Sequence, residues 1–151
     1  MAGIVSFAAL EIGQRWVGPG RTLTEGDLTM ACMISGDWHG IHADAEYAGT
    51  TPLGGRIFHG PFAIAIAMGM LANLVEFSDP VLGMLDIRDW NFKKPLFVGD
   101  TMHIEMSILD KHTTSGNRRG IVDRAIAIIN QNGVTVQEGK SRFMLDLTQA
   151  G

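Results

Sequence analysis

Cysteine is almost absent from this 151-residue sequence, and charged residues are scarce. Cys32 is the only thiol, which excludes an internal disulfide and a cysteine-based zinc site and is typical of a cytosolic (cytoplasmic) protein. Charged residues make up 19%, against about 25% in average proteins. We therefore expect a partner subunit to cover part of the surface. The 12 basic and 16 acidic residues give a net charge of −4, which lacks the basic excess that nucleic-acid binding requires.

The sequence also lacks a convincing leader or membrane segment. Residues 2–10 are mostly apolar, but no basic residue precedes them, and the first cation is Arg15. A secretory leader would begin with basic residues. Residues 57–75 carry no formal charge, yet the continuously apolar or small part covers only residues 61–72. Because a membrane-spanning helix needs about 20 apolar residues, this segment predicts a helix buried in a protein core and no membrane partner.

The length predicts one domain over residues 1–151, and the hydrophobic pattern predicts an α+β fold. A helix is expected from Thr24, with Asp27 at its third position, to Gly36, and a short one over residues 43–48. Gly60 and Pro61 open the apolar helix. Strands are expected over residues 14–23 (interrupted at 18–20), 82–90, 102–108, 121–129 and 143–147, with a hairpin at residues 132–133. Four of these strands follow the apolar helix, so we expect an antiparallel sheet that wraps around it.

Chemically informative residues gather just after the first helix and before the apolar one. Asp37 and His42 lie five residues apart, and His59 and Gly60 precede Pro61. A carboxylate and an imidazole in a partly dry pocket can orient one water and remove its proton. The first turn of a helix offers unpaired N–H groups that stabilise negative charge on a substrate carbonyl. The alternative interpretation is a helix-end carboxylate that bonds local N–H groups, next to a surface histidine.

Four ordered segments resemble a known family. They are GDWHGIHAD (36–44), GGRIFHG (54–60), WNFKKPLFVGD (90–100) and NQNG (130–133). They are similar to the motifs of the MaoC-like dehydratases and (R)-specific enoyl-CoA hydratases, and the resemblance covers residues 24–147. It implies a hot-dog fold, in which an antiparallel sheet wraps a long central helix, and a homodimer with its acyl-CoA site at the subunit interface.

The resemblance also implies residue roles. The family's water-activating pair falls on Asp37 and His42, and its thioester-binding glycine on Gly60, with His59 beside it. Water would add to an enoyl-CoA, or leave a 3-hydroxyacyl-CoA. No metal and no cofactor is expected, other than coenzyme A as part of the substrate.

Two departures from the family pattern bear on activity. His39-Gly40 replaces the usual Asn-Pro between the catalytic pair, and this replacement loosens the loop. Met68 stands where some members place a serine that holds the catalytic aspartate. Both departures concern the rate and the substrate, because neither removes an acid–base residue.

Other interpretations of the same residues are open. His39, His42 and a carboxylate from Asp37 or Asp44 have the composition of a metal site. His59 is interpreted as structural or as pocket-forming, and Trp38 as a pocket wall or an interface residue. His103 and His112 are interpreted as solvated. The basic pairs are interpreted either as solvated or as ligands of the CoA phosphates: Lys93 and Lys94, and Arg118 and Arg119.

Two other functions compete with the hydratase. The first, which the resemblance also allows, is a non-catalytic acyl-CoA-binding or regulatory hot-dog protein, similar to nodulation-type relatives, although such a protein has no need to keep both Asp37 and His42. A hot-dog thioesterase would place its acid or base on the central helix, where only Asn73 is polar.

Overall fold

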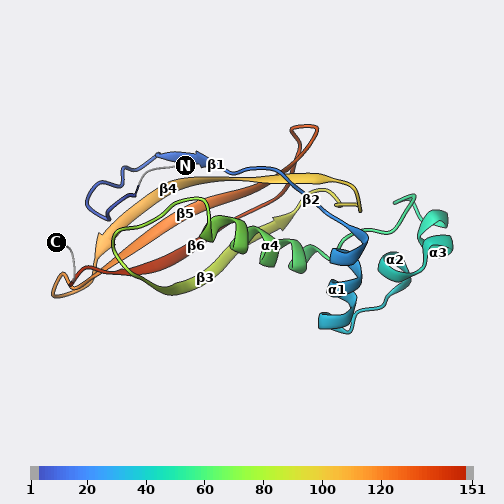
Figure 1. Ribbon diagram of the computed structural model, residues 1–151, viewed down its shortest axis with the longest axis horizontal. Helices are drawn as coiled ribbons and strands as arrows, with labels where there is room; N and C mark the ends of the chain where they lie inside the picture. Colours follow the sequence, from blue (N-terminus) through green and yellow to red (C-terminus); the bar gives the residue numbers. More distant parts are fainter. Residues whose placement is uncertain (1–3, 149–151) are drawn as a thin grey trace.

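The computed structural model describes residues 4–148 and consists mainly of one antiparallel sheet and one long helix (Figure 1). The strands are β1 (Arg15–Val17), β2 (Arg21–Thr22), β3 (Val81–Phe92), β4 (Thr101–Thr113), β5 (Arg119–Asn130) and β6 (Thr135–Asp146). The helices are α1 (Glu25–Ser35), α2 (Gly40–Ala43), α3 (Ala45–Thr50) and α4 (Gly60–Ala72). The predicted α+β class is confirmed.

The sheet has the strand order β1-β4-β5-β6-β3, with β2 beside β4, so β3 lies at one edge. The alternation predicted for β4 is present, since Met102, Ile104, Met106 and Ile108 are all buried. Across the sheet, Ile104 pairs with Ile128. Burial of each such side chain contributes roughly 1.5–3 kcal/mol, and the shared apolar face fixes the register because a one-residue slip would expose it.

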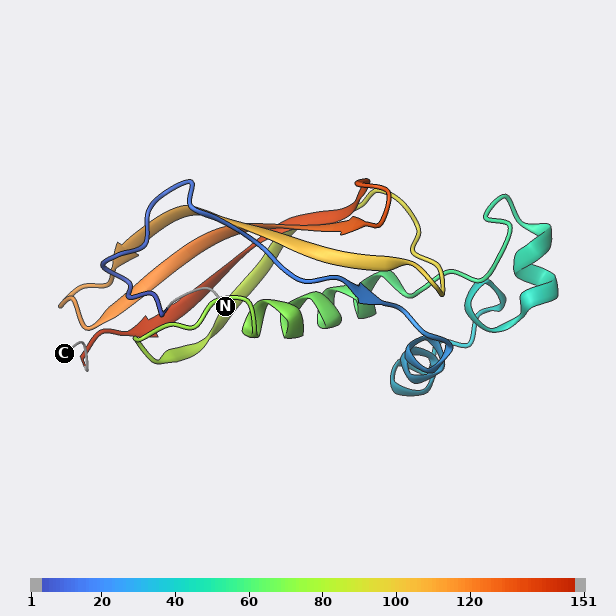
Figure 2. The ribbon, with the colours of Figure 1, turned by 45° about the horizontal axis from the view of Figure 1, so that its top comes forward.

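Helix α4 lies against part of this apolar face, toward the end of the sheet nearer α1 (Figure 2). Ala63, Ala67 and Leu71 recur every four residues and are buried there, and the small alanines bring helix and sheet close together. The opposite face of α4, which includes Ala65, Gly69 and Ala72, is exposed. A single chain therefore covers only one side of a helix that the sequence predicts to be surrounded.

Helices α1 to α3 project beyond one end of the sheet (Figures 1 and 2). Helix α1 begins and ends as predicted: Thr24 Oγ1 accepts the Asp27 N–H at 3.2 Å, the Asp27 carboxylate accepts the Thr24 N–H at 2.9 Å, and Gly36 closes the helix with φ 72°. The single helix predicted over residues 43–48 is in fact two. Asp44 separates them because it adopts extended backbone and caps α3 by accepting the Tyr47 N–H at 3.0 Å.

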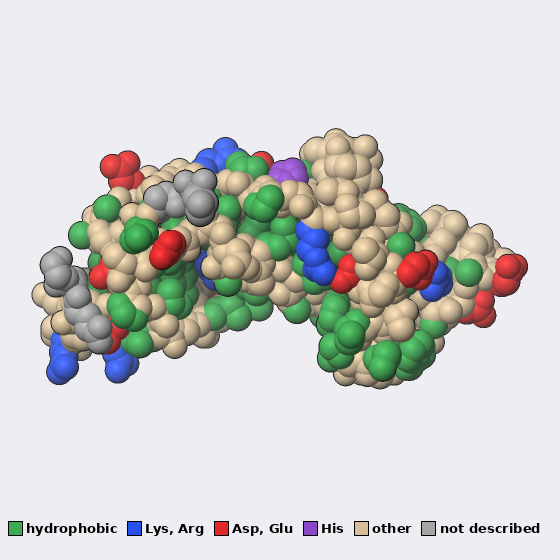
Figure 3. All heavy atoms as spheres, in the orientation of Figure 1, with side chains coloured by type: hydrophobic (Ala, Val, Ile, Leu, Met, Phe, Trp, Pro, Cys, Tyr) green, Lys and Arg blue, Asp and Glu red, His purple; other side chains and the backbone are tan. Residues whose placement is uncertain are grey.

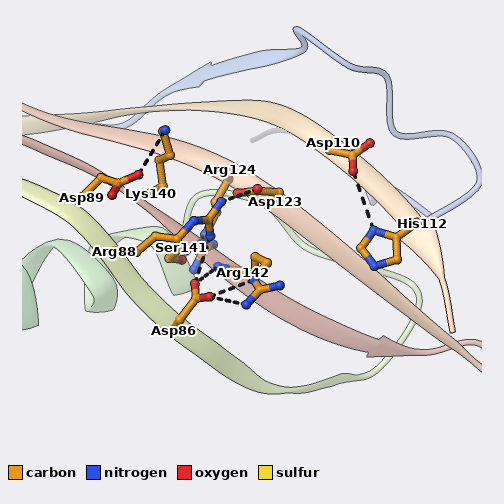
Figure 4. Close-up of polar contacts among 10 residues, drawn as sticks. All are labelled: Asp86, Arg88, Asp89, Asp110, His112, Asp123, Arg124, Lys140, Ser141 and Arg142. Atoms are coloured by element: carbon orange, nitrogen blue, oxygen red, sulfur yellow. Dashed lines mark hydrogen bonds and ion pairs between the residues drawn. The ribbon is translucent and has the colours of Figure 1, made fainter.

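Edge strand β3 is tied to the sheet by ion pairs as well as by its backbone (Figure 4). Asp86 accepts from the Arg142 side chain at 2.7 Å, and Arg88 pairs with both Asp86 and Asp123. Within residues 4–148, no helix is long and apolar enough to cross a membrane.

Candidate active site

A hollow of about 270 Å³ lies where α1 ends, α2 begins and α4 starts. The structure brings all four predicted site residues to it: Asp37, His42, His59 and Gly60. Ser35, Pro61 and Phe62 complete its lining. The hollow therefore collects side chains from a projecting segment and from the N-terminal end of the central helix.

His42 belongs to the short helix α2 rather than to the loop where the sequence placed it. Its Nδ1 lies 2.8 Å from the Ile57 carbonyl, and since a carbonyl only accepts, Nδ1 carries the proton. The other nitrogen, Nε2, then has a free lone pair in the neutral ring. Nε2 faces Asp37 Oδ2 at 3.6 Å, which is too long for a direct hydrogen bond and suited to a water that donates to both atoms.

Asp37 is fixed by its own backbone neighbours. Its N–H donates to Ser35 Oγ, and its Oδ1 accepts the His39 N–H, both at 3.1 Å. The local bonding expected of a helix-end aspartate is thus present, but it uses only Oδ1 and leaves Oδ2 facing the histidines. The Asp37 side chain is 49% exposed, so this oxygen is accessible to solvent and substrate.

His59 is buried next to His42. Its Nε2 lies 3.0 Å from the Asp37 main-chain carbonyl, to which it must donate. Its ring stacks on His42 with the centroids 3.7 Å apart and the planes 19° apart. His59 bonds backbone, as the structural interpretation predicted, although the acceptor lies in the Asp37 loop. The ring thereby holds both the aspartate and the plane of His42.

Gly60 supplies an unpaired N–H at the start of α4. The next residue, Pro61, has no N–H, and the Phe62 and Ala63 N–H groups both donate to the His59 carbonyl. No hydrogen bond from the Gly60 N–H occurs within residues 4–148. This donor, at the positive end of the α4 dipole, is available to a ligand oxygen.

Sequence reasoning missed the residues that hold Gly60 in place. Gln137 Nε2 donates to the Gly60 carbonyl at 3.2 Å, and Gln137 Oε1 accepts from Trp90 Nε1 at 3.0 Å. Gln137 is buried. An isolated glutamine in a strand carries no pattern that would identify it as a contact of a helix 77 positions earlier.

A second, larger hollow of about 420 Å³ lies on the other side of Gly60. Gly60 and Pro61 line both hollows, and apolar side chains form most of the second: Leu53, Ile57, Phe58, Phe92, Pro95 and Leu96. Lys93 and Lys94 also line it. Lys93 pairs with Glu138 at 2.5 Å, whereas Lys94 makes no ion pair within the described part of the chain.

The buried thiol of Cys32 lies close enough to the Asp37 carboxylate for that charge to affect its pKa. Burial raises the pKa of the Cys32 thiol, and the Asp37 carboxylate raises it further. Cys32 therefore stays protonated and is no nucleophile at neutral pH.

Asp37, His42 and His59 also form the one group with metal-ligand composition in the described residues, with ligand atoms within 4.8 Å. His59 Nε2 lies 3.8 Å from Asp37 Oδ2, but it already donates to the Asp37 main-chain carbonyl. Two free ligand atoms remain, fewer than zinc sites use, so the arrangement does not fit a metal. The alternative metal site with His39 is wrong, because His39 does not belong to this group of ligand atoms; its Nδ1 accepts the Ile41 N–H instead.

The other residues singled out in the sequence do not line the hollow at Asp37. His112 is exposed and faces Asp110 at 3.7 Å (Figure 4), in agreement with a solvated role. Trp38 is 56% exposed on the projecting segment. Arg118 and Arg119 lie at the turn between β4 and β5, beside a third hollow of about 530 Å³.

Curated relatives support the resemblance. The chain is 29% identical over 121 residues to Protein MaoC of Klebsiella aerogenes, covering 80% of this chain and 35% of that protein. It is 25% identical over 108 residues to a 3-hydroxybutyryl-CoA dehydratase of Methylorubrum extorquens, covering 71% of this chain and 66% of that protein. The chain thus spans about a third of the first relative and just under two thirds of the second.

Solved structures share the fold. A monoamine oxidase regulatory protein from Archaeoglobus fulgidus aligns over 96% of both chains at 27% identity, with a TM-score of 0.85. The (R)-hydratase PhaJ1 of Pseudomonas aeruginosa aligns over 92% of this chain and 84% of its own at 30% identity, with a TM-score of 0.73. A Mycobacterium tuberculosis protein described as having a double hotdog fold aligns over 98% of this chain and 46% of its own at 20% identity, with a TM-score of 0.81.

A family model for the MaoC like domain matches residues 7–127. The predicted hot-dog fold is confirmed by these comparisons, and the chain belongs to the MaoC-like domain family.

Proposed function

We propose that the protein is a hydro-lyase that adds water to the double bond of an enoyl thioester, or removes it from the 3-hydroxyacyl thioester. The observation that supports this most directly is the gap between His42 Nε2 and Asp37 Oδ2. A proton acceptor and an anionic oxygen 3.6 Å apart bind one water through its two hydrogens and leave its oxygen lone pairs directed at a substrate.

The reaction follows from this geometry. His42 Nε2 takes a proton from the water while Asp37 orients it, and the water oxygen bonds to C3 of the enoyl group. Electron density moves to the thioester oxygen, where the Gly60 N–H stabilises the developing charge. The proton then leaves His42 for C2, so one water is added without another reactant. General acid–base catalysis contributes about 10²–10⁴ in rate, and one oxyanion donor about 2.7–4 kcal/mol.

Coenzyme A is the carrier we propose for the acyl group. The dehydratase from Methylorubrum extorquens acts on a CoA thioester by its name, and the long apolar hollow beside Gly60 suits the pantetheine arm. In this placement the thioester lies at Gly60, the acyl group enters the Asp37–His42 hollow, and the arm occupies the other hollow.

A homodimer is part of the proposal. Strand β3 and the outer face of α4 are uncovered in the single chain, and Figure 3 shows apolar side chains along this side and on α1. A second chain would cover the face of α4 that the sequence predicts to be buried.

A non-catalytic acyl-CoA-binding role is the second candidate. It is favoured by the description of the Archaeoglobus structure as a regulatory protein. The arrangement of the site argues for catalysis instead, because ligand binding alone needs no lone pair on His42 held opposite a carboxylate.

Hydration of crotonyl-CoA tests the proposal, measured as loss of the enoyl-thioester absorbance. We expect turnover in the wild type, with the same rate in EDTA because no metal takes part. Asp37→Asn and His42→Ala should each lower kcat by about 10²–10⁴, while His112→Ala, at an exposed histidine that does not line the hollow, should not. Wild-type turnover in the Asp37 or His42 variant would refute the assignment. CoA binding without turnover of enoyl thioesters of several chain types would favour the non-catalytic role.

A further inference from the structure

Gly60 is the residue of α4 whose backbone is least restricted by its own sequence. Glycine adopts a wider range of backbone angles than other residues, and a proline disfavours helical angles in the residue before it. Both conditions apply to Gly60, because it is the first residue of α4 and Pro61 follows it. Its N–H is the donor that the proposed reaction uses at the thioester oxygen. The direction of this donor therefore depends on contacts from outside the helix as well.

Gln137 supplies such a contact from β6. Its Nε2 donates to the Gly60 carbonyl at 3.2 Å, and the residue is only 3% exposed. The peptide group before Gly60 is fixed separately, since the His59 carbonyl accepts the N–H groups of Phe62 and Ala63. With the peptide groups on both sides of its Cα atom held, Gly60 has a defined backbone, and its N–H has a defined direction.

Trp90 fixes the orientation of the Gln137 amide. Its Nε1 lies 3.0 Å from Gln137 Oε1. An indole nitrogen only donates and a main-chain carbonyl only accepts. The amide therefore turns its oxygen to Trp90 and its nitrogen to Gly60, and the reverse orientation would lose both hydrogen bonds. We call this arrangement of Trp90, Gln137 and Gly60 the amide bridge.

A bulge in edge strand β3 directs Trp90 toward this amide. The register of β3 against β6 shifts between Arg88 and Asn91, and Asp89 there has φ 52°. Bulges of this kind change the direction of a side chain. A Cβ atom at position 139 would lie 2.8 Å from Trp90 Cδ2 and 3.1 Å from its Cα, so Gly139 leaves the room that the indole occupies. Backbone strain at Asp89 and a glycine opposite Trp90 thus both serve to place the indole N–H.

We propose that Gln137, oriented by Trp90, is a positioning residue that directs the Gly60 N–H at the thioester oxygen. This inference rests on the proposed function. Gln137 acts through the Gly60 carbonyl and not on the reacting atoms. Because the Gly60 N–H stabilises charge that develops in the transition state, loss of its direction lowers kcat rather than raising KM.

Crotonyl-CoA kinetics test this role. Gln137→Leu removes the donor and should lower kcat about ten-fold, with KM within about two-fold of the wild-type value. Ser141→Ala is the matched control, because Ser141 is buried on the same face of β6 and its Oγ accepts from Arg124 Nε at 3.0 Å. It should leave kcat unchanged. Wild-type kcat in Gln137→Leu, or an equal fall in both variants, would overturn the inference.

Gln137→Glu separates hydrogen-bond donation from shape, since the two side chains have nearly the same shape and Gln137 also lines the larger hollow. A protonated carboxyl can donate to the Gly60 carbonyl, whereas an ionised one only accepts. The ratio of kcat in this variant to kcat in the wild type should therefore fall as the pH rises through the pKa of the new carboxyl, which burial raises. A ratio that stays constant between about pH 5 and pH 9 would contradict donation.

A double-mutant cycle tests whether Trp90 acts through Gln137. Trp90→Phe keeps a ring opposite Gly139 but cannot donate to Gln137 Oε1, and it should lower kcat about three-fold. Added to Gln137→Leu, it should cause no further loss, because the amide that Trp90 orients is then absent. Losses of kcat that multiply in the double variant would show that Trp90 acts independently of Gln137.

Failure of the proposed function is separable from failure of the amide bridge. The ¹³C resonance of the Gly60 carbonyl and the ¹H resonance of the Trp90 indole N–H report its two hydrogen bonds without substrate. Both should shift in Gln137→Leu and neither in Ser141→Ala. If the wild type hydrates no enoyl thioester, titration with butyryl-CoA still tests the positioning. The Gly60 amide proton should then shift in the wild type and shift less in Gln137→Leu, and equal shifts would overturn the inference.

Discussion

At the scale of single residues, the two stacked histidines differ in which ring nitrogen bonds a backbone carbonyl. His42 is anchored through Nδ1 to the Ile57 carbonyl, so its Nε2 is free to accept a proton. His59 is anchored the other way, with Nε2 donating to the Asp37 carbonyl. In the proposed reaction, hydrogen-bond partners rather than residue type therefore assign His42 as the base and His59 as its support.

His59→Phe tests this supporting role. Phenylalanine keeps a ring against His42 but cannot donate to the Asp37 carbonyl, and a lost neutral hydrogen bond is worth about 1 kcal/mol. We expect kcat for crotonyl-CoA to fall about five-fold, with KM little changed.

His59→Gln is the companion variant, because its amide can donate to the same carbonyl. It should recover part of the lost kcat. Equal kcat in His59→Phe and the wild type would show that the hydrogen bond does not position Asp37.

At the scale of elements, the N-terminal end of α4 joins the two hollows. Gly60 is required there for close approach: a Cβ atom would lie 2.7 Å from two ring carbons of Phe92. Phe92 lines the larger hollow, so a side chain at position 60 must displace the ring and change the shape of the space proposed for the pantetheine arm.

We therefore predict that Gly60→Ala raises KM for crotonyl-CoA and lowers kcat/KM by about ten-fold or more, as expected when a small displacement misplaces a substrate. Steady-state kinetics are the measurement. Gly49→Ala is the control, since a methyl group added at position 49, in α3, would have nothing within 4 Å. Identical kinetics for Gly60→Ala and Gly49→Ala would place the thioester elsewhere.

The N-terminal cap of α1 has a separate, structural role. Thr24→Ala removes one half of the reciprocal Thr24–Asp27 bonding and should lower the free energy of unfolding by about 0.5–2 kcal/mol. Urea denaturation measures this. Thr29→Ala, at an exposed position within the same helix, should be neutral or slightly stabilising because alanine is the better helix former. A Thr24→Ala protein as stable as Thr29→Ala would contradict the cap.

At the scale of the whole molecule, one chain leaves its most apolar helix half covered. The sheet covers the face of α4 with Ala63 and Ala67, while Ala65 and Gly69 remain exposed. This face and strand β3 together form an uncovered surface, and no further element within residues 4–148 covers it.

Ile87→Lys places a charge at the middle of this free edge and should convert the protein to a monomer. Sedimentation velocity should give about twice the 16.3 kDa chain mass for the wild type and about the chain mass for the variant. Val17→Lys, on an exposed residue of β1 at the opposite edge, should leave the mass unchanged. Equal masses for the two variants would exclude β3 as the dimer edge.

Local patterns were sufficient for most elements. The Thr24 cap, the Gly36 terminus, the alternation in β4 and the Gly60-Pro61 helix start depend on neighbours within a few positions, and all are confirmed. The division of residues 40–50 into α2 and α3 was missed, because it depends on Asp44 changing its backbone to cap the second helix. The cytosolic location indicated by the lone Cys32 stays a prediction.

The sequence by itself determined the α+β class, because hydrophobic spacing encodes it. Its four ordered motifs identified the family and the candidate set Asp37, His42, His59 and Gly60, whose roles stay a prediction. Only the tertiary structure decided which nitrogen of each histidine is free, that Gln137 holds the Gly60 carbonyl, and that Gly60 lies between two hollows. These features depend on contacts between residues 15 to 77 positions apart. Such contacts follow from how the chain packs, and no local pattern records them.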